Sequence, residues 1–136
     1  MANTADYKEI NGWGKQAYQV VLEYDFDNDA GAKGTLVMGK FLQKTLIRKG
    51  VVHCVAAGTS GGSATVVFGT VTGDPNGILD ATDGAVANLT LGATVFTATT
   101  SDNLLVAANE TLDMTIATDT LTAGKFWVIL ECYQVD

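Results

Sequence analysis

Alternation of apolar and polar side chains is the feature that most constrains how this chain can fold. Between residues 18 and 27 every second side chain is apolar, and the positions between them are mostly polar or acidic. Side chains point to opposite faces of a β-strand with a period of two, so this pattern predicts a strand with one buried face. The apolar positions are Tyr18, Val20, Leu22, Tyr24 and Phe26.

Further strand-like segments follow, separated by turns rich in Gly, Asn and Asp, and no long segment has the 3.6-residue period of a helix. This arrangement predicts an all-β, jelly-roll-like β-sandwich of about eight strands, because two facing sheets let each alternating strand bury one face. Residues 78–91 have weak periodicity and are predicted to form a loop with one helical turn. The other predicted strands are 34–39, 44–57, 63–71, 93–98, 104–107, 111–118 and 125–135.

The chain of 136 residues fits a single domain. Residues 1–16 lack strand periodicity, so we expect an extended N-terminal arm at 1–16 and one β-sandwich domain at 17–136. The opening residues have no apolar signal-peptide core, and the long uncharged runs are too rich in Gly, Ser and Thr to form membrane-spanning helices. We therefore expect synthesis in the cytoplasm and no membrane partner.

The net charge of −7 is unevenly distributed along the sequence. Seven of the eight basic residues lie within residues 1–50, whereas nine of the fifteen acidic residues follow that segment. An acidic body is repelled by phosphate backbones, so the charge argues against nucleic acid as a partner.

The stretch YDFDNDAGAKG resembles the start of a calcium-binding loop. In the best register, however, Ala30 stands where the loop needs glycine, and Leu36 stands where it needs the bidentate glutamate. We therefore interpret Asp25 and Asp27 as the solvated side of the strand, followed by a turn. Weak adventitious cation binding stays open.

Catalytic residues are not expected. His53 is the single histidine, and a hydrolytic triad would need it beside Ser60, Ser63 or Ser101, with an aspartate behind it. We therefore interpret His53 as a strand residue at a sheet surface, and we expect no catalytic site and no cofactor.

Cys54 and Cys132 are the only cysteines, and in a reducing compartment they are expected to remain buried thiols. A metal site formed with His53 is disfavoured because adjacent strand residues point to opposite faces. We expect the two cysteines on neighbouring strands, because the second and final strands of a jelly roll commonly pair.

The predicted last strand is apolar on both faces, interrupted only by Glu131. One face should meet the core, and the other is covered by the arm, by another subunit or by nothing. The first face carries Phe126, Val128, Leu130 and Cys132, and the second carries Trp127, Ile129 and Tyr133.

Two long runs resemble capsid decoration proteins, also called cement proteins, of tailed bacteriophages. They are VVHCVAAGTSGGSATVVFGTVTGDPNGILDATDG at residues 51–84 and LLVAANETLDMTIATDTLTAGKFWVILECYQ at residues 104–134. The resemblance covers about two-thirds of the chain and lies in the arrangement of hairpins. It implies a jelly-roll protein, commonly a homotrimer, that attaches to the outside of an icosahedral head and clamps neighbouring major capsid protein subunits.

Such a role needs a stable binding surface and no catalytic group. A fibre subunit of the phage tail or head that recognises host glycans is the alternative, and a small enzyme is a third. In the arm, aromatic side chains suit a lattice contact or a strap over the protein's own sheet. The candidate contact residues are Tyr7, Trp13, Tyr18, Lys44, Arg48, Lys49, Trp127 and Tyr133.

Overall fold

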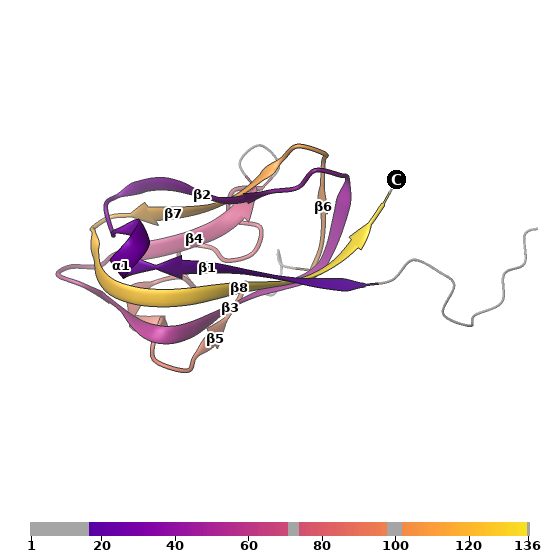
Figure 1. Cartoon of the computed structure of the whole chain (residues 1–136). Coiled ribbons are helices and arrows are strands. Elements are labelled where there is room, and N and C mark those ends of the chain that lie inside the picture. Colours follow the sequence, from indigo (N-terminus) through magenta and orange to yellow (C-terminus); the bar gives the residue numbers. More distant parts are fainter. Residues whose placement is uncertain (1–16, 71–73, 98–101, 136) are drawn as a thin grey trace, which may run out of the picture.

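The computed structural model describes residues 17–70, 74–97 and 102–135, except for the side chains of residues 102 and 103. Two antiparallel sheets pack face to face as a β-sandwich, which confirms the predicted fold class (Figure 1). The predicted arm, with Tyr7 and Trp13, lies outside the described residues, and so does Ser101. No helix in the described ranges is long and apolar enough to cross a membrane.

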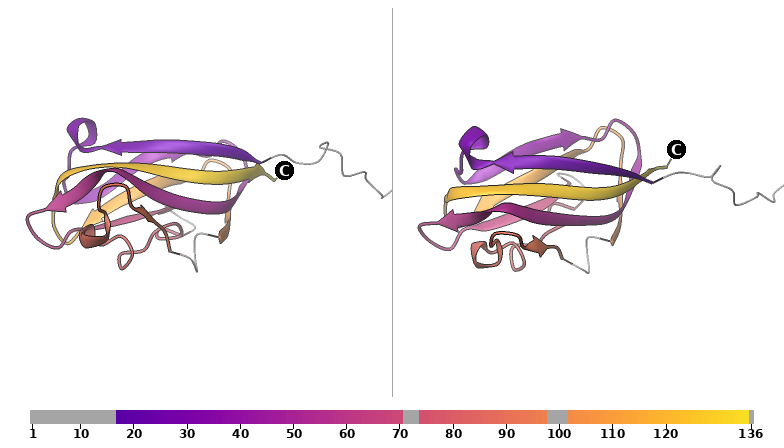
Figure 2. Two further views of the ribbon diagram at one scale, coloured as in Figure 1. Left: turned by 90° about the horizontal axis from the view of Figure 1, so that it is seen from below. Right: turned by 60° about the horizontal axis from the view of Figure 1, so that its bottom comes forward.

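Sheet A contains β1, β8, β3 and β5 in that order, and β6 also pairs with β3. Figure 2 shows β1, β8 and β3 side by side as one broad face of the molecule. The bounds of these strands are Tyr18–Asp25 for β1, Leu121–Gln134 for β8, Thr45–Ser60 for β3, Thr94–Val95 for β5 and Asp102–Val106 for β6.

Sheet B contains β2, β7 and β4, with β7 in the centre. Two short helices complete the described elements. The bounds are Gly34–Lys40 for β2, Thr111–Ala117 for β7, Thr65–Thr70 for β4, Phe26–Asp29 for α1 and Val86–Asn88 for the 3-10 helix η2.

The first four strands alternate between the two sheets, and the final strand returns to lie between β1 and β3. This order is the jelly-roll arrangement. Beside β4, where a further strand would lie, the described part of the loop after β4 makes isolated bridges, between Phe68 and Leu79 and between Thr65 and Ala85. That loop holds the predicted helical turn as η2.

The inward faces of both sheets form one hydrophobic core. Tyr24 of β1 and Phe126 of β8 lie opposite each other in register, and both side chains are fully buried. Gly58 and Gly124 leave room for the Phe126 ring, because a Cβ at either position would contact its Cζ atom, at 2.9 Å and 2.8 Å respectively. The predicted alternation of the first strand is confirmed by this packing.

Several predicted boundaries were wrong, among them those of β1, β8 and β5. β1 ends at Asp25 because its side chain accepts a hydrogen bond from the Asp27 amide and so caps α1, which places Asp27 in a helical turn. β8 begins at Leu121 instead of residue 125, because residues 121–123 extend the hairpin with β3. The strand predicted at 93–98 is reduced to the two residues of β5.

The two cysteines lie on neighbouring strands, as predicted, since β3 and β8 pair. They are not opposite each other: Cys54 faces Phe126 across the pair, and Cys132 faces Ile47. Both are buried free thiols.

Candidate interaction surfaces

The outer face of sheet A carries side chains in regular cross-strand rows. In the middle row Val21 of β1, Ile129 of β8 and Val51 of β3 are register partners. Val21 is 50% exposed, and the other two are partly buried. This row is an apolar band across three strands that the described part of the chain does not fully cover.

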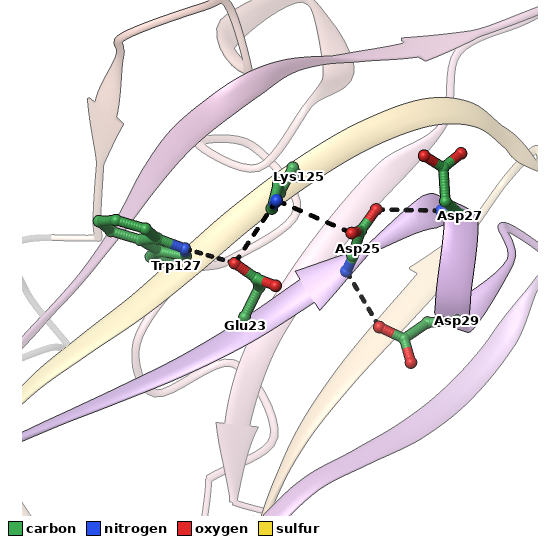
Figure 3. A network of polar contacts seen from close by, with 6 residues as sticks. All are labelled: Glu23, Asp25, Asp27, Asp29, Lys125 and Trp127. Atoms are coloured by element: carbon green, nitrogen blue, oxygen red, sulfur yellow. Dashed lines mark hydrogen bonds and ion pairs between the residues drawn. The ribbon is translucent and has the colours of Figure 1, made fainter.

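The next row consists of Glu23, Trp127 and His53 (Figure 3 shows the first two). Trp127 Nε1 donates a hydrogen bond of 2.8 Å to Glu23 Oε2, which fixes the orientation of an indole that is still 38% exposed. The His53 ring lies 6.4 Å from the indole, between ring centroids, and its Nδ1 is 2.9 Å from Thr94 Oγ1. The row therefore presents an oriented aromatic surface.

Lys125, the last acidic residues of β1 and the aspartates of α1 form the charged end of this face. Lys125 Nζ lies 3.9 Å from Glu23 Oε2 and 3.8 Å from Asp25 Oδ2 (Figure 3). The Asp25 side chain accepts from the Asp27 amide at 3.1 Å, and the Asp29 carboxylate accepts from the Asp25 amide at 3.0 Å. These carboxylates organise a strand end and a helical turn, so the calcium-loop geometry is not formed here.

A third row, Gln19, Glu131 and Lys49, borders a shallow depression of about 430 Å³ beside the apolar band. Lys49 Nζ lies 4.8 Å from the centre of the Phe96 ring, a cation–π distance. The depression is lined by residues that include Tyr18, Gln19, Lys49, Val51, Ile129 and Glu131.

The predicted basic cluster is only partly assembled. A β-bulge between Ile47 and Lys49 leaves both Arg48 and Lys49 exposed, side by side on β3. Lys44 is exposed just before the strand begins, and its carbonyl accepts a hydrogen bond from the Val135 amide. Of the three basic side chains, Lys49 is the one that lines the depression.

The remaining candidates lie at two different places. Tyr133 is on the outer parity of β8 and forms a further apolar row with Leu46 and Leu105. Tyr18 has the inward parity, opposite Cys132, and lies at the edge of the sandwich, where it borders a groove of about 330 Å³ that Phe41 and Leu42 also line. Tyr18 also lines the depression on the outer face, so it lies at the edge between the groove and the depression.

Groups that could carry chemistry are separated in the structure. His53 meets Thr94, whereas the Ser60 hydroxyl donates to the Thr120 carbonyl at 2.7 Å at the hairpin end. His53 is on the outer face and Cys54 faces the core, as the strand geometry predicts. In the described ranges no three His, Cys, Asp or Glu side chains are grouped closely enough to hold a metal.

Burial makes the thiols poor nucleophiles. It raises the pKa of Cys54 to about 11, and burial with a smaller effect of Glu131 raises the pKa of Cys132 to about 11. Because the thiolate is the reactive form, both cysteines are inert near neutral pH.

Sequence reasoning missed the apolar band, although a signal was present. Val21 interrupts an otherwise polar set of alternate positions in the first strand. Its importance depends on register, since only the pairing of β1 with β8 and of β8 with β3 aligns it with Ile129 and Val51.

Comparison with solved structures finds chains with a similar fold. No protein-family model matches the sequence, and no curated protein matches it. Among solved structures, a chain of the cyanophage Pam1 capsid asymmetric unit is similar with a TM-score of 0.63 and 14% identity, covering 98% of both chains. A chain of the acidic stable capsid structure of Helicobacter pylori bacteriophage KHP30 is similar with a TM-score of 0.60 and 12% identity, covering 88% of this chain and 93% of that one. The chain therefore shares its β-sandwich fold with chains found in phage capsid structures.

Proposed function

We propose that this protein is a non-enzymatic structural component of a phage virion that decorates the capsid. It binds the outer surface of an icosahedral head and clamps neighbouring major capsid protein subunits. In this proposal the protein is made in the host cytoplasm, assembles as a homotrimer and acts on the exterior of the virion.

The observation that carries the proposal is the similarity to the Pam1 capsid chain, which extends over 98% of both chains. A match of this extent leaves little of the fold to serve a separate enzymatic domain. The separation of His53 from Ser60 and the inert thiols are consistent with a structural role.

The outer face of sheet A is the surface that we assign to the capsid contact. Its apolar band, its oriented indole and the adjacent Arg48 and Lys49 give an apolar centre with a polar rim, as protein interfaces commonly have. Aromatic residues contribute strongly to interface energies, and Trp127 belongs to this face.

Capsid stabilisation then follows from mass action. A ligand that binds the assembled shell and not the dispersed subunits shifts the equilibrium towards assembly. A homotrimer that engages several capsid subunits at once gains a further factor from multivalency. Weak individual contacts between the protein and the capsid subunits are therefore enough to stabilise the shell.

The test uses purified full-length protein and phage heads that lack it. We expect the protein to sediment with the heads at saturation and to raise their melting temperature. Unchanged melting after saturating addition would contradict the proposed function, and adsorption to host cells in place of heads would favour the fibre alternative.

Two valines offer a matched pair for mapping the contact. Val21 is 50% exposed on the outer face of sheet A, and Val37 is 61% exposed on the outer face of sheet B. Val21→Ser should weaken head binding by about fivefold, the equivalent of about 1 kcal/mol, whereas Val37→Ser should leave it unchanged. Equal effects of the two variants would remove the assignment to sheet A.

A further inference from the structure

The outer edge of β1 is an open edge of sheet A in the part of the chain that the structure describes. β1 pairs with β8 on one side, and no described strand pairs with its other side. An open strand edge presents unpaired backbone N–H and C=O groups, and natural proteins usually cover such an edge because it otherwise pairs with other chains. β1 therefore offers a template on which a further strand can pair.

The end of β1 shows which backbone groups face this open edge. The Asp25 amide donates to Asp29 Oδ2 at 3.0 Å, on the side away from β8 (Figure 3). Backbone groups alternate in direction along a strand of an antiparallel pair. The N–H and C=O groups of Gln19, Val21 and Glu23 therefore point to the open edge as well, and α1 covers that edge only at its Asp25 end.

The pairing of β3 gives the same direction independently. Cys54 of β3 exchanges two backbone hydrogen bonds with the segment just before β5, at 2.8 Å and 2.9 Å, so its backbone groups point away from β8. Its neighbour His53 therefore forms a hydrogen-bonded pair with Trp127, and the alternation along β8 then directs Phe126 to β1. Tyr24 is the register partner of Phe126 and points to β8, which leaves the odd-numbered residues of β1 facing the open edge.

The sequence before β1 contains a strong signal for a hairpin turn. Asn11-Gly12 is a preferred pair for a two-residue hairpin loop, because both central residues of that loop need a positive φ. Such a loop makes Ile10 and Trp13 hydrogen-bonded partners, and an aromatic side chain beside a β-branched one is a favourable cross-strand pair. The sequence therefore favours a hairpin whose second strand continues into β1.

The register of this hairpin agrees with the open edge. Continued along the chain, it pairs Thr4 with Gln19 and Ala2 with Val21, both through hydrogen bonds. Gln19 and Val21 are residues whose backbone groups face the open edge. A register shifted by one residue would instead direct the hydrogen bonds to residues that already pair with β8. Turn and edge thus specify the same alignment.

We propose that residues 2–10 of the same chain bind the open edge of β1 as an additional antiparallel strand of sheet A. The strand places Ala2 beside Val21, which extends the apolar band by one side chain. On the other face it places Ala5 beside Tyr18, at the groove of about 330 Å³. Closing a two-residue loop costs little entropy, so this segment pairs in preference to a second copy. This inference does not depend on the proposed capsid function.

A pair of introduced cysteines tests the register directly. In the proposed strand Ala5 and Tyr18 are a non-hydrogen-bonded pair with Cα atoms about 4.5 Å apart, which is within the range of a disulfide. Oxidation of the dilute full-length Ala5→Cys/Tyr18→Cys variant by dissolved oxygen should therefore form a disulfide within one chain, detected by mass spectrometry of tryptic peptides. The native thiols do not compete because both are buried.

Ala5→Cys/Gln19→Cys is the matched control. It shifts one partner by one residue, so the two side chains lie on opposite faces of the sheet and should not be joined. A disulfide within one chain in the first variant and not in the second supports the proposal. A disulfide between two chains would overturn it in favour of a second copy, and so would the absence of a disulfide or equal yields in the two variants.

Amide hydrogen exchange gives a second measurement that needs no cysteine. In the wild type the Val21 amide should exchange slowly, because the added strand accepts its hydrogen bond. Gly12→Val opposes the positive φ of the turn and should speed exchange at Val21 by about tenfold or more, whereas Gly14→Val lies outside the turn and should leave it unchanged. Fast exchange at Val21 in the wild type, or exchange that Gly12→Val does not alter, would contradict the added strand.

Discussion

The Tyr24 ring of β1 stacks on the Phe126 ring of β8, with ring centroids 5.5 Å apart and ring planes inclined by 20°. Both side chains are fully buried, and they join the edge strand of sheet A to the strand beside it. Phe126→Ala should lower the free energy of unfolding by about 3–5 kcal/mol, because it removes the ring and leaves a cavity. Urea unfolding followed by tryptophan fluorescence measures the change.

Tyr24→Phe is the conservative companion of that variant. It keeps the stacked ring and removes only the hydroxyl, which donates a 2.6 Å hydrogen bond to the Ala30 carbonyl. We expect a loss of about 1 kcal/mol, the usual net value of one hydrogen bond. A loss as large as that of Phe126→Ala would show that the stack is not the main source of stability.

Substitutions at two glycines test where the loop after β4 lies relative to that strand. A Cβ at Gly84 would collide with the Val66 carbonyl oxygen, whereas a Cβ at Gly61 has no heavy atom within 4 Å. Gly84→Ala should therefore cost about 1–3 kcal/mol through overpacking, and Gly61→Ala should change stability by less than about 0.5 kcal/mol. Equal midpoints of urea unfolding for the two variants would contradict the placement of this loop.

Alkaline pH should weaken the fold in a predictable direction. Burial raises the pKa of both thiols from 9.0 to about 11, and burial with the charges of Asp29 and Asp25 raises the pKa of Tyr24 from 10.0 to about 12. The folded state therefore holds these protons more tightly than the unfolded state does. The resulting stability is fully present below about pH 9 and is lost as the pH rises through about 11.

Unfolding midpoints measured between about pH 7 and pH 11 check this prediction. A Cys54→Ala/Cys132→Ala double variant starts from a lower stability because it loses core volume. Its midpoint should fall less steeply above pH 9, since only the Tyr24 contribution remains. If the unfolding midpoint of the variant falls with pH as steeply as that of the wild type, the thiols do not contribute to the pH dependence of stability.

Trp127 tests the proposed capsid contact. Its indole is held by Glu23 and remains 38% exposed, so it is available as an anchor for a partner. Trp127→Ala should weaken binding to heads by about 30-fold, the equivalent of about 2 kcal/mol. Sedimentation of the variant with heads measures the effect, and circular dichroism confirms that the variant is folded.

Much of the fold could be predicted from residue patterns alone. The alternation from Tyr18 onwards and the apolar parities of the last strand mark burial directly, because each depends only on neighbours along the chain. The placement of Cys54 and Cys132 on neighbouring strands was also predicted correctly, although the strand that pairs with β8 is the third strand and not the second. The resemblance to decoration proteins agrees with the fold shared with phage capsid chains.

Other features depend on contacts that sequence patterns do not encode. The alternation continues through Phe26, but the capping bond that the Asp25 carboxylate accepts from the Asp27 amide places Phe26 in a helical turn. Asp113 has an outward position on β7 and would be predicted to be exposed, yet it is only 6% exposed. The aligned row of Val21, Ile129 and Val51 likewise exists only through strand register.

A cryo-electron microscopy map of heads saturated with this protein tests the central claim most directly. We predict the β-sandwich on the exterior of the shell, with the outer face of β1, β8 and β3 against the major capsid protein and Trp127 at the contact. A map in which that face points to solvent, or in which the protein is missing from the outer surface of the head, would contradict the account.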